Sequence, residues 1–218
     1  MGAAVLQKQF ESILQWQVAP APELVRTGIS EVDAATGGLP RGALTEIFGP
    51  ASSGRTSLLT SILAAATERQ EICALVDAED AFDPAPAAAA GVRLERLLWI
   101  RCGHNVEHAL KAVDLLVQGG GFGLVVMDLG DTPPRTVRRI SLTSWFRLRR
   151  AVEHTPTVLV AVAQQSNAKT CSSLMLECTR ERVTWSGGTP LFRGMQVRVA
   201  RRKPAREVTA SFQTAALE

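Results

Sequence analysis

The segment Gly49–Thr56 (GPASSGRT) constrains the fold more than any other part of this chain. Its spacing is that of a phosphate-binding loop, G-x-x-x-x-G-K-T, except that Arg55 stands where such loops carry lysine. The apolar run Leu44–Phe48 precedes it and the helix-like run Ser57–Thr67 follows, which predicts a strand, a glycine loop and a helix in that order. Because such a loop wraps phosphates with backbone N–H groups at a helix N-terminus, the segment predicts a nucleotide site. The alternative is a plain glycine turn before a helix.

The expected ligands of this site are ATP and Mg²⁺. Thr56 offers a hydroxyl to the metal, and Asp128, at the end of the apolar run Leu124–Asp128, is expected to hold the metal's shell. Arg55 keeps the positive charge of lysine, but its guanidinium is bulkier and places that charge differently. Nucleotide binding is therefore expected to survive more readily than hydrolysis. The other residues expected to bind the nucleotide are Gly49, Ser52, Ser53, Gly54 and Ser57.

Apolar segments alternate with helix-like segments from residue 44 onward. Continuous apolar strands between helices are typical of a parallel sheet covered on both faces, so an α/β fold with a mostly parallel central sheet is expected. Three strand-like runs within residues 181–213 predict an antiparallel edge. A helix is expected over His104–Val117, and further strands over Ile72–Asp77, Leu97–Ile100, Gly123–Asp128 and Thr157–Ala163.

The first 26 residues differ in pattern from the rest. Residues 1–17 carry the apolar stripe of a short amphipathic helix, and residues 18–26, with Pro20 and Pro22, are typical of an extended linker. We expect that helix to dock on a neighbouring subunit or on the main domain, residues 27–218. No apolar run reaches the roughly 18 residues of a membrane span. Because the N-terminus is also too polar for a secretory signal, a cytoplasmic protein without a membrane partner is expected.

The cysteines and histidines form no metal motif. Cys73, Cys102, Cys171 and Cys178 show no C-x-x-C spacing, and the three histidines make no pattern with them. Reduced structural thiols and no metal held by these residues are therefore expected.

Charge is divided unevenly along the chain. Residues 1–134 carry 9 Lys/Arg and 16 Asp/Glu, a balance of −7, whereas residues 135–218 carry 15 and 5, a balance of +10. A basic half suggests a polyanion partner. The alternative is a head-to-tail contact with the acidic half of another copy.

Six arginines lie in or next to Thr136–His154, which reads as a single amphipathic helix. At about 100° per residue, five of the six fall within about 120° of arc, opposite apolar positions that include Trp145. Such a face would contact the phosphates of DNA, single-stranded DNA above all, without regard to sequence. Trp145 and Trp185 are expected in the core. The six arginines are Arg135, Arg138, Arg139, Arg147, Arg149 and Arg150.

Several motifs, in order and spacing, resemble the core of the bacterial RecA recombinases over about Thr27–Gln213. They are Thr27–Asp33 (TGISEVD), Gly37–Gly42 (GGLPRG), Glu46–Pro50 (EIFGP), Ser52–Thr56 (SSGRT), Val76–Pro84 (VDAEDAFDP) and Gly91–Val92.

This resemblance implies roles for residues outside the loop. Glu79 would polarise the attacking water, Asp83 would read the adenine, and Gln164 would sense the γ-phosphate. The alternatives are a solvated acidic turn for Glu79 and Asp83, and Gln165 in place of Gln164.

The resemblance also implies a homo-oligomer, in which Arg201 and Lys203 reach the ATP of the neighbouring subunit. The alternative for these two residues is a basic edge strand. Three departures from the family argue against strand exchange. Arg55 replaces a lysine, Pro86 replaces an aromatic residue that stacks on adenine, and Gln165–Cys171 is far shorter than the second DNA-binding loop of a recombinase. Little follows the last expected strand, so the family's C-terminal domain is expected to be missing.

A shortened RecA-like chain of this kind is similar to the ImuA family, a RecA-like accessory of the bacterial mutasome. That resemblance implies translesion synthesis in the SOS response, at the nucleoid, with the Y-family-like polymerase homologue ImuB and an error-prone polymerase as partners. An ATP-binding accessory protein of this kind is the first hypothesis. The alternatives are a DNA-dependent ATPase of recombinational repair and a nucleotide-independent scaffold with a relic loop.

Overall fold

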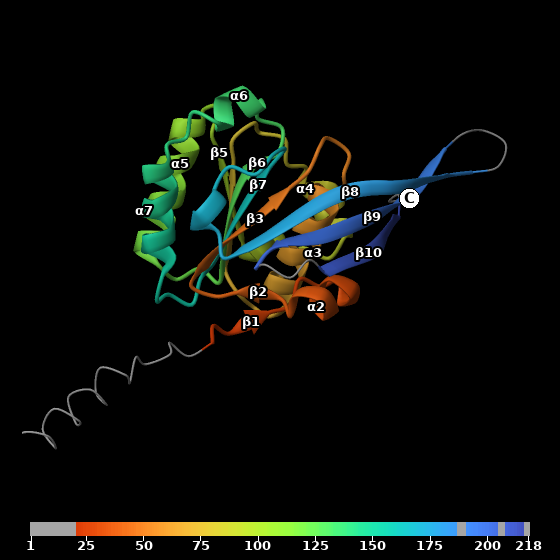
Figure 1. Cartoon of the computed structure of the whole chain (residues 1–218), viewed down its shortest axis with the longest axis horizontal. Helices are drawn as coiled ribbons and strands as arrows, with labels where there is room; N and C mark the ends of the chain where they lie inside the picture. The colour runs from red at the N-terminus through yellow and green to blue at the C-terminus, as the bar shows by residue number, and fades with distance from the viewer. Residues whose placement is uncertain (1–20, 187–190, 205–207, 216–218) are drawn as a thin grey trace, which may run out of the picture.

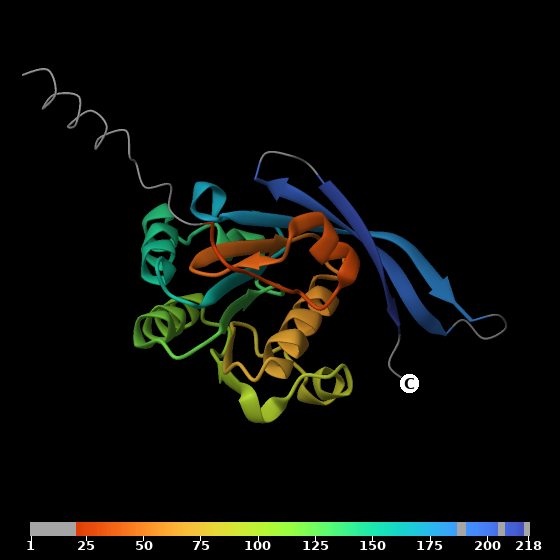
Figure 2. The same cartoon turned by 90° about the horizontal axis from the view of Figure 1, so that it is seen from below.

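The computed structural model describes residues 21–186, 191–204 and 208–215 (Figure 1). The helix expected over residues 1–17 and the first part of the expected linker lie outside the described residues. The described chain forms one large sheet with helices against both faces (Figure 2). The expected α/β fold is therefore confirmed.

Eight strands make the large sheet: β3 (Ala43–Phe48), β4 (Cys73–Asp77), β5 (Leu97–Arg101), β6 (Leu124–Leu129), β7 (Val158–Ala163), β8 (Leu174–Trp185), β9 (Phe192–Lys203) and β10 (Val208–Ala215). Their order across the sheet is β10-β9-β8-β3-β7-β6-β4-β5. The pairs from β8 through β3, β7, β6 and β4 to β5 are parallel, and β9 pairs antiparallel with both β8 and β10. The mostly parallel sheet with an antiparallel C-terminal edge is as predicted.

Helices cover the two faces of the sheet unequally. On one face lie α2 (Ser30–Thr36), α3 (Arg55–Glu68) and α4 (Pro84–Ala89). On the other face lie α5 (Val106–Gly119) and α7 (Leu142–Val152). The sheet is thus covered as a parallel sheet must be, because its central strands are apolar on both sides. Shorter elements are α6 (Pro134–Val137), η1 (Leu94–Arg96) and η2 (Lys169–Cys171).

Each face of the sheet has its own apolar core. Leu58, Ile62 and Leu63 of α3 pack in the first core, and Val113 of α5 and Trp145 of α7 pack in the second. Every residue of β4 and of β7 is buried, which explains why these strands show no polar alternation. The placement of Trp145 in the core is as predicted.

The hairpin of β8 and β9 extends beyond the body of the domain (Figure 1). At its outer end Trp185 pairs with Phe192, and their rings meet edge to face at 6.0 Å between centroids. Trp185 is 57% exposed, so the prediction of a core position for it is wrong. A strand is buried only where helices reach it, and this end of the hairpin lies past the helices.

A small sheet precedes the main one. β1 (Leu24–Val25) pairs antiparallel with β2 (Leu39–Pro40). Val25 and Leu39 are buried in the first core. The sequence predicts that the domain starts at Thr27. The folded part of the chain begins earlier, because β1 precedes that residue.

The arginine-rich segment is not one helix. α6 ends at Val137, and α7 begins only at Leu142. Ser141 separates them, because its side chain caps α7 by accepting the backbone N–H of Ser144 at 3.1 Å. The predicted single helix over Thr136–His154, and the arc of arginines computed from it, are therefore wrong.

All four cysteines, Cys73, Cys102, Cys171 and Cys178, are buried, and none is joined to another in a disulfide. In the part of the chain that the structure describes, no group of histidine, cysteine and acidic side chains is arranged to hold a metal ion. None of its helices is both long and apolar enough to cross a membrane.

Candidate functional site

The nucleotide loop, Gly49–Thr56, joins β3 to α3 at the carboxyl edge of the parallel strands. Gly54 has a φ of 91°, and a Cβ there would lie 2.3 Å from Cγ2 of Val197. A Cβ on Gly49 would lie 2.2 Å from the carbonyl oxygen of Cys178. Since no side chain fits at either position, glycine allows the loop to seat directly against β8 and β9.

The Arg55 side chain turns into the protein. It is buried, and its Nη1 donates a hydrogen bond to the carbonyl oxygen of Gly130, 3.0 Å away in the turn after β6. Burial lowers the pKa of Arg55, and the negative charges of Asp128 and Asp131 partly offset that effect. The cation of the nucleotide loop is thus engaged by acceptors of its own chain.

Asp128 lies next to this contact, near the end of β6. Its Oδ1 accepts the backbone N–H of Gly130 at 2.8 Å. Burial raises the pKa of Asp128 to about 6; the bond from Gly130 and the charge of Arg55 oppose this rise, whereas Asp77 and Asp131 add to it. Because the ionised carboxylate is poorly solvated here, a cation beside it would be stabilising.

A cavity of about 650 Å³, which we name the loop cavity, runs along α3 towards α4 and β10. It brings together Thr56, Ser57, Asp83 and Asp128, four of the residues predicted to bind nucleotide. The other predicted residues do not line this cavity as far as the described chain shows: Gly49, Ser52, Ser53, Gly54 and Arg55.

Three lining residues of the loop cavity were not anticipated from the sequence. Ile29 comes from the turn before α2, and Phe212 and Gln213 come from β10. No motif marks them, because the fold alone brings the two ends of the described chain to α3. The only signal is the strand pattern around Phe212, and that pattern predicts burial without a site.

Several features of the loop fit a phosphate group and its metal. Ser53 Oγ is buried and has no hydrogen-bond partner among the described residues. α3 begins after Gly54 without a side-chain cap, so its first N–H groups are free for an anion. Thr56 is exposed in the first turn and shares the loop cavity with Asp128. These groups suit Mg-ATP, whereas Arg55 is turned towards Gly130.

The acidic turn after β4 is organised by Asp77. Its carboxylate accepts the backbone N–H of Phe82 at 2.9 Å and the indole N–H of Trp99 at 3.2 Å. This turn carries Glu79 inward, where the side chain is only 18% exposed. Asp83, in contrast, is exposed and caps α4 by accepting the N–H of Ala85.

Glu79 has two partners at the carboxyl edge. Its Oε1 accepts the hydroxyl of Thr132 at 2.8 Å, and its Oε2 lies 2.8 Å from Nδ1 of His104. This hydrogen bond raises the pKa of His104. The carboxylate predicted to polarise water is therefore held by two neighbouring side chains, and neither partner was expected from the sequence.

The remaining residues implied by the resemblance lie on β7 and β9. Gln164 directly follows the last residue of β7 and is partly buried. Arg201 is partly buried and lies in register with Val208 of β10. Lys203 Nζ donates to the carbonyl oxygen of Thr170 at 3.1 Å and to that of Ser172, so Lys203 ties β9 to the loop before β8.

The six arginines predicted to bind DNA fall into two groups. Arg147 pairs with Asp114 at 3.3 Å and Arg149 pairs with Glu153 at 3.0 Å. No carboxylate partner is found, in the described part of the chain, for the exposed Arg135, Arg138, Arg139 and Arg150.

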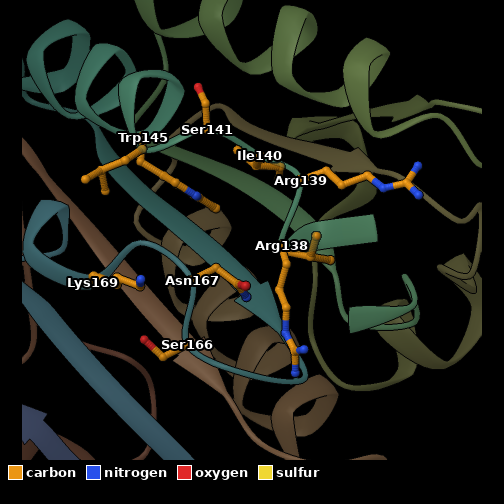
Figure 3. Close-up of a pocket in the computed structure, with 10 residues that line it drawn as sticks. Arg138, Arg139, Ile140, Ser141, Trp145, Ser166, Asn167 and Lys169 are labelled. Atoms are coloured by element: carbon orange, nitrogen blue, oxygen red, sulfur yellow. The ribbon is translucent and has the colours of Figure 1, made fainter. Parts of the chain in front are cut away.

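Arg138 and Arg139 line a second cavity, of about 510 Å³, which we name the basic cavity (Figure 3). It lies between the link from α6 to α7 and the loop after β7. Arg138 also donates to Oε1 of Gln165 at 2.6 Å, which joins the two walls. Its other lining residues are Val137, Ile140, Ser141, Leu142, Trp145, Ser166, Asn167 and Lys169.

Glu46 of β3 holds one wall of the basic cavity from beneath. The Glu46 carboxylate is fully buried and accepts three hydrogen bonds, from the hydroxyl of Ser166 at 2.8 Å and from the backbone N–H groups of Asn167 and Ala168 at 2.5 and 2.9 Å. Sequence reasoning quoted Glu46 as part of a motif but gave it no role. A charged residue in an otherwise apolar strand was the signal.

Comparison with known proteins agrees with the motifs. The chain matches the family RecA N-terminal domain over residues 7–134, more than half of its 218 residues. Protein RecA of Chloroflexus aurantiacus is 34% identical over 160 residues, which cover 66% of this chain and 45% of that protein. Protein RecA of Deinococcus radiodurans is 35% identical over 158 residues, which cover 65% of this chain and 43% of that protein. The chain spans less than half the length of these curated relatives.

The match covers the nucleotide loop, the acidic turn after β4 and Asp128, which the fold assembles at one edge of a parallel sheet. The chain belongs to the RecA family.

Proposed function

We propose that this chain is a RecA-like accessory protein of DNA repair. It binds ATP with Mg²⁺ at the nucleotide loop, turns it over slowly or not at all, and contacts single-stranded DNA with the arginines around the basic cavity. Protein partners of the repair pathway then bind the chain in its complex with ATP and single-stranded DNA.

The contact of Arg55 with Gly130 is the observation that carries the slow turnover. A phosphate-binding loop needs a mobile cation that follows the charge developing on the transferred phosphoryl group. Arg55 is buried and bonded within the chain, so moving it to the phosphates would break that bond and take its positive charge away from Asp128 and Asp131. Backbone N–H groups, Thr56 and Asp128 are left to hold Mg-ATP.

DNA contact is supported by the unpaired cations at the basic cavity. Arg139 and Lys169 are exposed there, and Arg135 lies nearby on α6. Cations that have no acidic partner within the chain are available to phosphates. When they bind a strand, the counterions condensed on that strand are released. Arg147 and Arg149 are less suited, because each already faces a carboxylate.

The departures from the recombinase pattern support an accessory role over strand exchange. With Arg55 and Pro86 in the nucleotide site and a short Gln165–Cys171 segment, the chain is similar to the ImuA family. We therefore propose translesion synthesis in the SOS response, in the cytoplasm at the nucleoid, with the polymerase homologue ImuB and an error-prone polymerase. The uneven charge along the chain also suits a homo-oligomer, in which Arg201 and Lys203 reach a neighbour's ATP.

The test is thermal stability with and without Mg-ATP, for the wild type and for Asp128→Ala, with turnover assayed in the same samples. A ligand that binds only the folded state raises the melting temperature. We expect stabilisation of the wild type, loss of most of it in Asp128→Ala, and little turnover. Fast turnover stimulated by DNA would instead support an ATPase of recombinational repair.

A nucleotide-independent scaffold is the second candidate, and the same contact of Arg55 favours it. In that case saturating Mg-ATP leaves the melting temperature of both proteins unchanged. Single-stranded DNA, added separately, then shows whether the basic cavity works without the nucleotide loop.

A further inference from the structure

We propose that the basic cavity takes one nucleobase of a single strand, with a carbonyl oxygen of that base accepting the indole N–H of Trp145. This inference rests on the proposed contact with DNA and adds a recognition element to it. The strand's phosphates then lie at the cations of the cavity rim, and one base leaves its stack to enter.

Trp145 is the observation that points to a ligand. It is 2% exposed, yet it lines the basic cavity, and no acceptor among the described residues takes its indole N–H. Trp99 shows the usual arrangement, since its Nε1 donates to Oδ2 of Asp77 at 3.2 Å. The fully buried polar atoms that lack a partner in the described chain do not include Nε1 of Trp145, so this N–H opens into the basic cavity, where an acceptor of a ligand can take the place of water.

The walls around Trp145 suit a flat, partly apolar group. Val137, Ile140 and Leu142 offer aliphatic surface, and Figure 3 shows the indole of Trp145 and the amide of Asn167 directed towards the same space. A volume of about 510 Å³ lies within the usual range for small-ligand sites, roughly 300–1,000 Å³.

Charge at the cavity selects the rest of the ligand. Arg138, Arg139 and Lys169 line it, and no acidic side chain does so in the described part of the chain. α7 begins in the same wall at Leu142, so the positive end of its dipole adds to the three cations. Inorganic phosphate would use the cations but leave the apolar wall in water. A nucleotide unit uses both, because its base is apolar on its faces and its phosphates are anionic.

The site is held in place before any ligand arrives. Glu46 fixes Ser166, Asn167 and Ala168 through three hydrogen bonds, and the bond from Arg138 to Gln165 joins this wall to the opposite one. Little ordering of the walls is needed on binding, which favours affinity.

The experiment compares three short single strands of equal length by fluorescence anisotropy. One carries thymine at every position, one carries a thymine isostere with fluorine in place of both carbonyl oxygens, and one is fully abasic. All three present the same phosphates. Each is titrated against the wild type, Trp145→Phe and the matched control Trp185→Phe, whose tryptophan lies on the hairpin, away from the basic cavity.

For the wild type we expect the thymine strand to bind at least about fivefold more tightly than the abasic strand, as stacking in a pocket gives. It should also bind about fivefold more tightly than the isostere, as one hydrogen bond gives. Trp145→Phe should abolish the preference over the isostere, and Trp185→Phe should keep it.

Three outcomes overturn the inference. Equal binding of all three strands by the wild type means that phosphates alone are read, which leaves the proposed DNA contact intact. An unchanged preference in Trp145→Phe, with folding verified by urea unfolding, places the base elsewhere. No binding of any strand overturns the DNA contact as well as the base site. The wild-type titrations decide the first and third outcomes even if Trp145→Phe does not fold.

Discussion

The nucleotide loop and the basic cavity lie at the same carboxyl edge of the parallel sheet, and each contains arginine, but they treat it in opposite ways. Arg55 is buried and bonded to the carbonyl of Gly130, so its charge is satisfied within the chain. At the basic cavity Arg139 is exposed without an internal acid in the described chain, and the N–H of Trp145 has no acceptor there. The cation of the nucleotide loop is thus satisfied within the chain, although Ser53 Oγ is not, whereas the cations of the basic cavity and the N–H of Trp145 are left for a ligand.

This difference indicates which of the two sites has side chains that remain available to a ligand. A group that is satisfied in the free protein must give up a partner to serve a ligand, whereas an unsatisfied group gains one. In the proposed function, the loop therefore holds a nucleotide chiefly with its backbone, and the basic cavity supplies side chains for recognition. Four changes would break or sharpen this contrast.

The largest effect is expected at Glu46, which supports the basic cavity. Glu46→Ala removes the buried acceptor of three donors, which are the hydroxyl of Ser166 and the backbone N–H groups of Asn167 and Ala168. We expect a loss of about 3 kcal/mol in the free energy of unfolding. Urea unfolding measures it, with Glu46→Gln as a control that keeps one acceptor oxygen and should lose less. A midpoint equal to that of the wild type would show that the three hydrogen bonds contribute little.

The next effect is expected at Arg55. Arg55→Met should cost about 2 kcal/mol in the free energy of unfolding, because it removes the cation beside Asp128 and Asp131 and the donor to Gly130. Arg55→Lys should cost less and should raise the stabilisation by Mg-ATP, since a lysine carries a compact charge on a flexible stem and is less tied to Gly130. Thermal melts with and without Mg-ATP measure both. If Mg-ATP raises the melting temperature of Arg55→Lys no more than that of the wild type, the contact of Arg55 with Gly130 does not limit nucleotide binding.

A smaller effect is expected from single arginines at the basic cavity. Arg138→Gln and Arg139→Gln should each flatten the dependence of single-strand affinity on salt by about 0.7 in the log–log slope. Arg147→Gln, matched in charge, should change the slope little because Asp114 already faces that side chain. Equal changes for all three arginines would mean that the whole α6–α7 surface, and not the cavity rim, contacts phosphates.

The smallest effect is expected from His104, which holds Glu79. The hydrogen bond with Glu79 raises the pKa of His104 above its usual 6.5. The stabilisation is therefore fully present below about pH 6.5 and is lost as pH rises through the raised value. The difference in melting temperature between the wild type and His104→Gln should be small, largest at acidic pH, and absent at alkaline pH. His108→Gln, on an exposed part of α5, is the control. A difference that does not vary with pH would mean that the imidazole acts without its charge.

Much of the fold was predictable because its signals are local. Each parallel strand is a short apolar run, and the nucleotide loop has a fixed spacing, so β3, β4, β6, β7 and α3 were anticipated within a few residues. The break between α6 and α7 was missed for a different reason. The periodicity of apolar residues continues across Ser141, and the cap that interrupts the helix is one side-chain hydrogen bond.

The sites depend on contacts that no local pattern carries. The direction of Arg55 is set by a carbonyl 75 positions away in the sequence. The basic cavity exists because Glu46, more than 100 positions earlier, draws in the loop after β7 against α7. The sequence identified residue types suited to phosphates, and the fold decides which of them remain available.

The contact between Gly54 and Val197 has a mechanical consequence. A Cβ at position 54 would stand 2.3 Å from a Val197 methyl, so the nucleotide loop packs against β9 without room for either to shift independently. The outer half of the same hairpin, with Trp185 and Phe192 at its end, projects past the helices, so a force on its end would be transmitted along β9 to the loop. If a nucleotide binds at the loop as proposed, we expect bending of the hairpin to change the affinity for that nucleotide, and the nucleotide to restrain the hairpin in return.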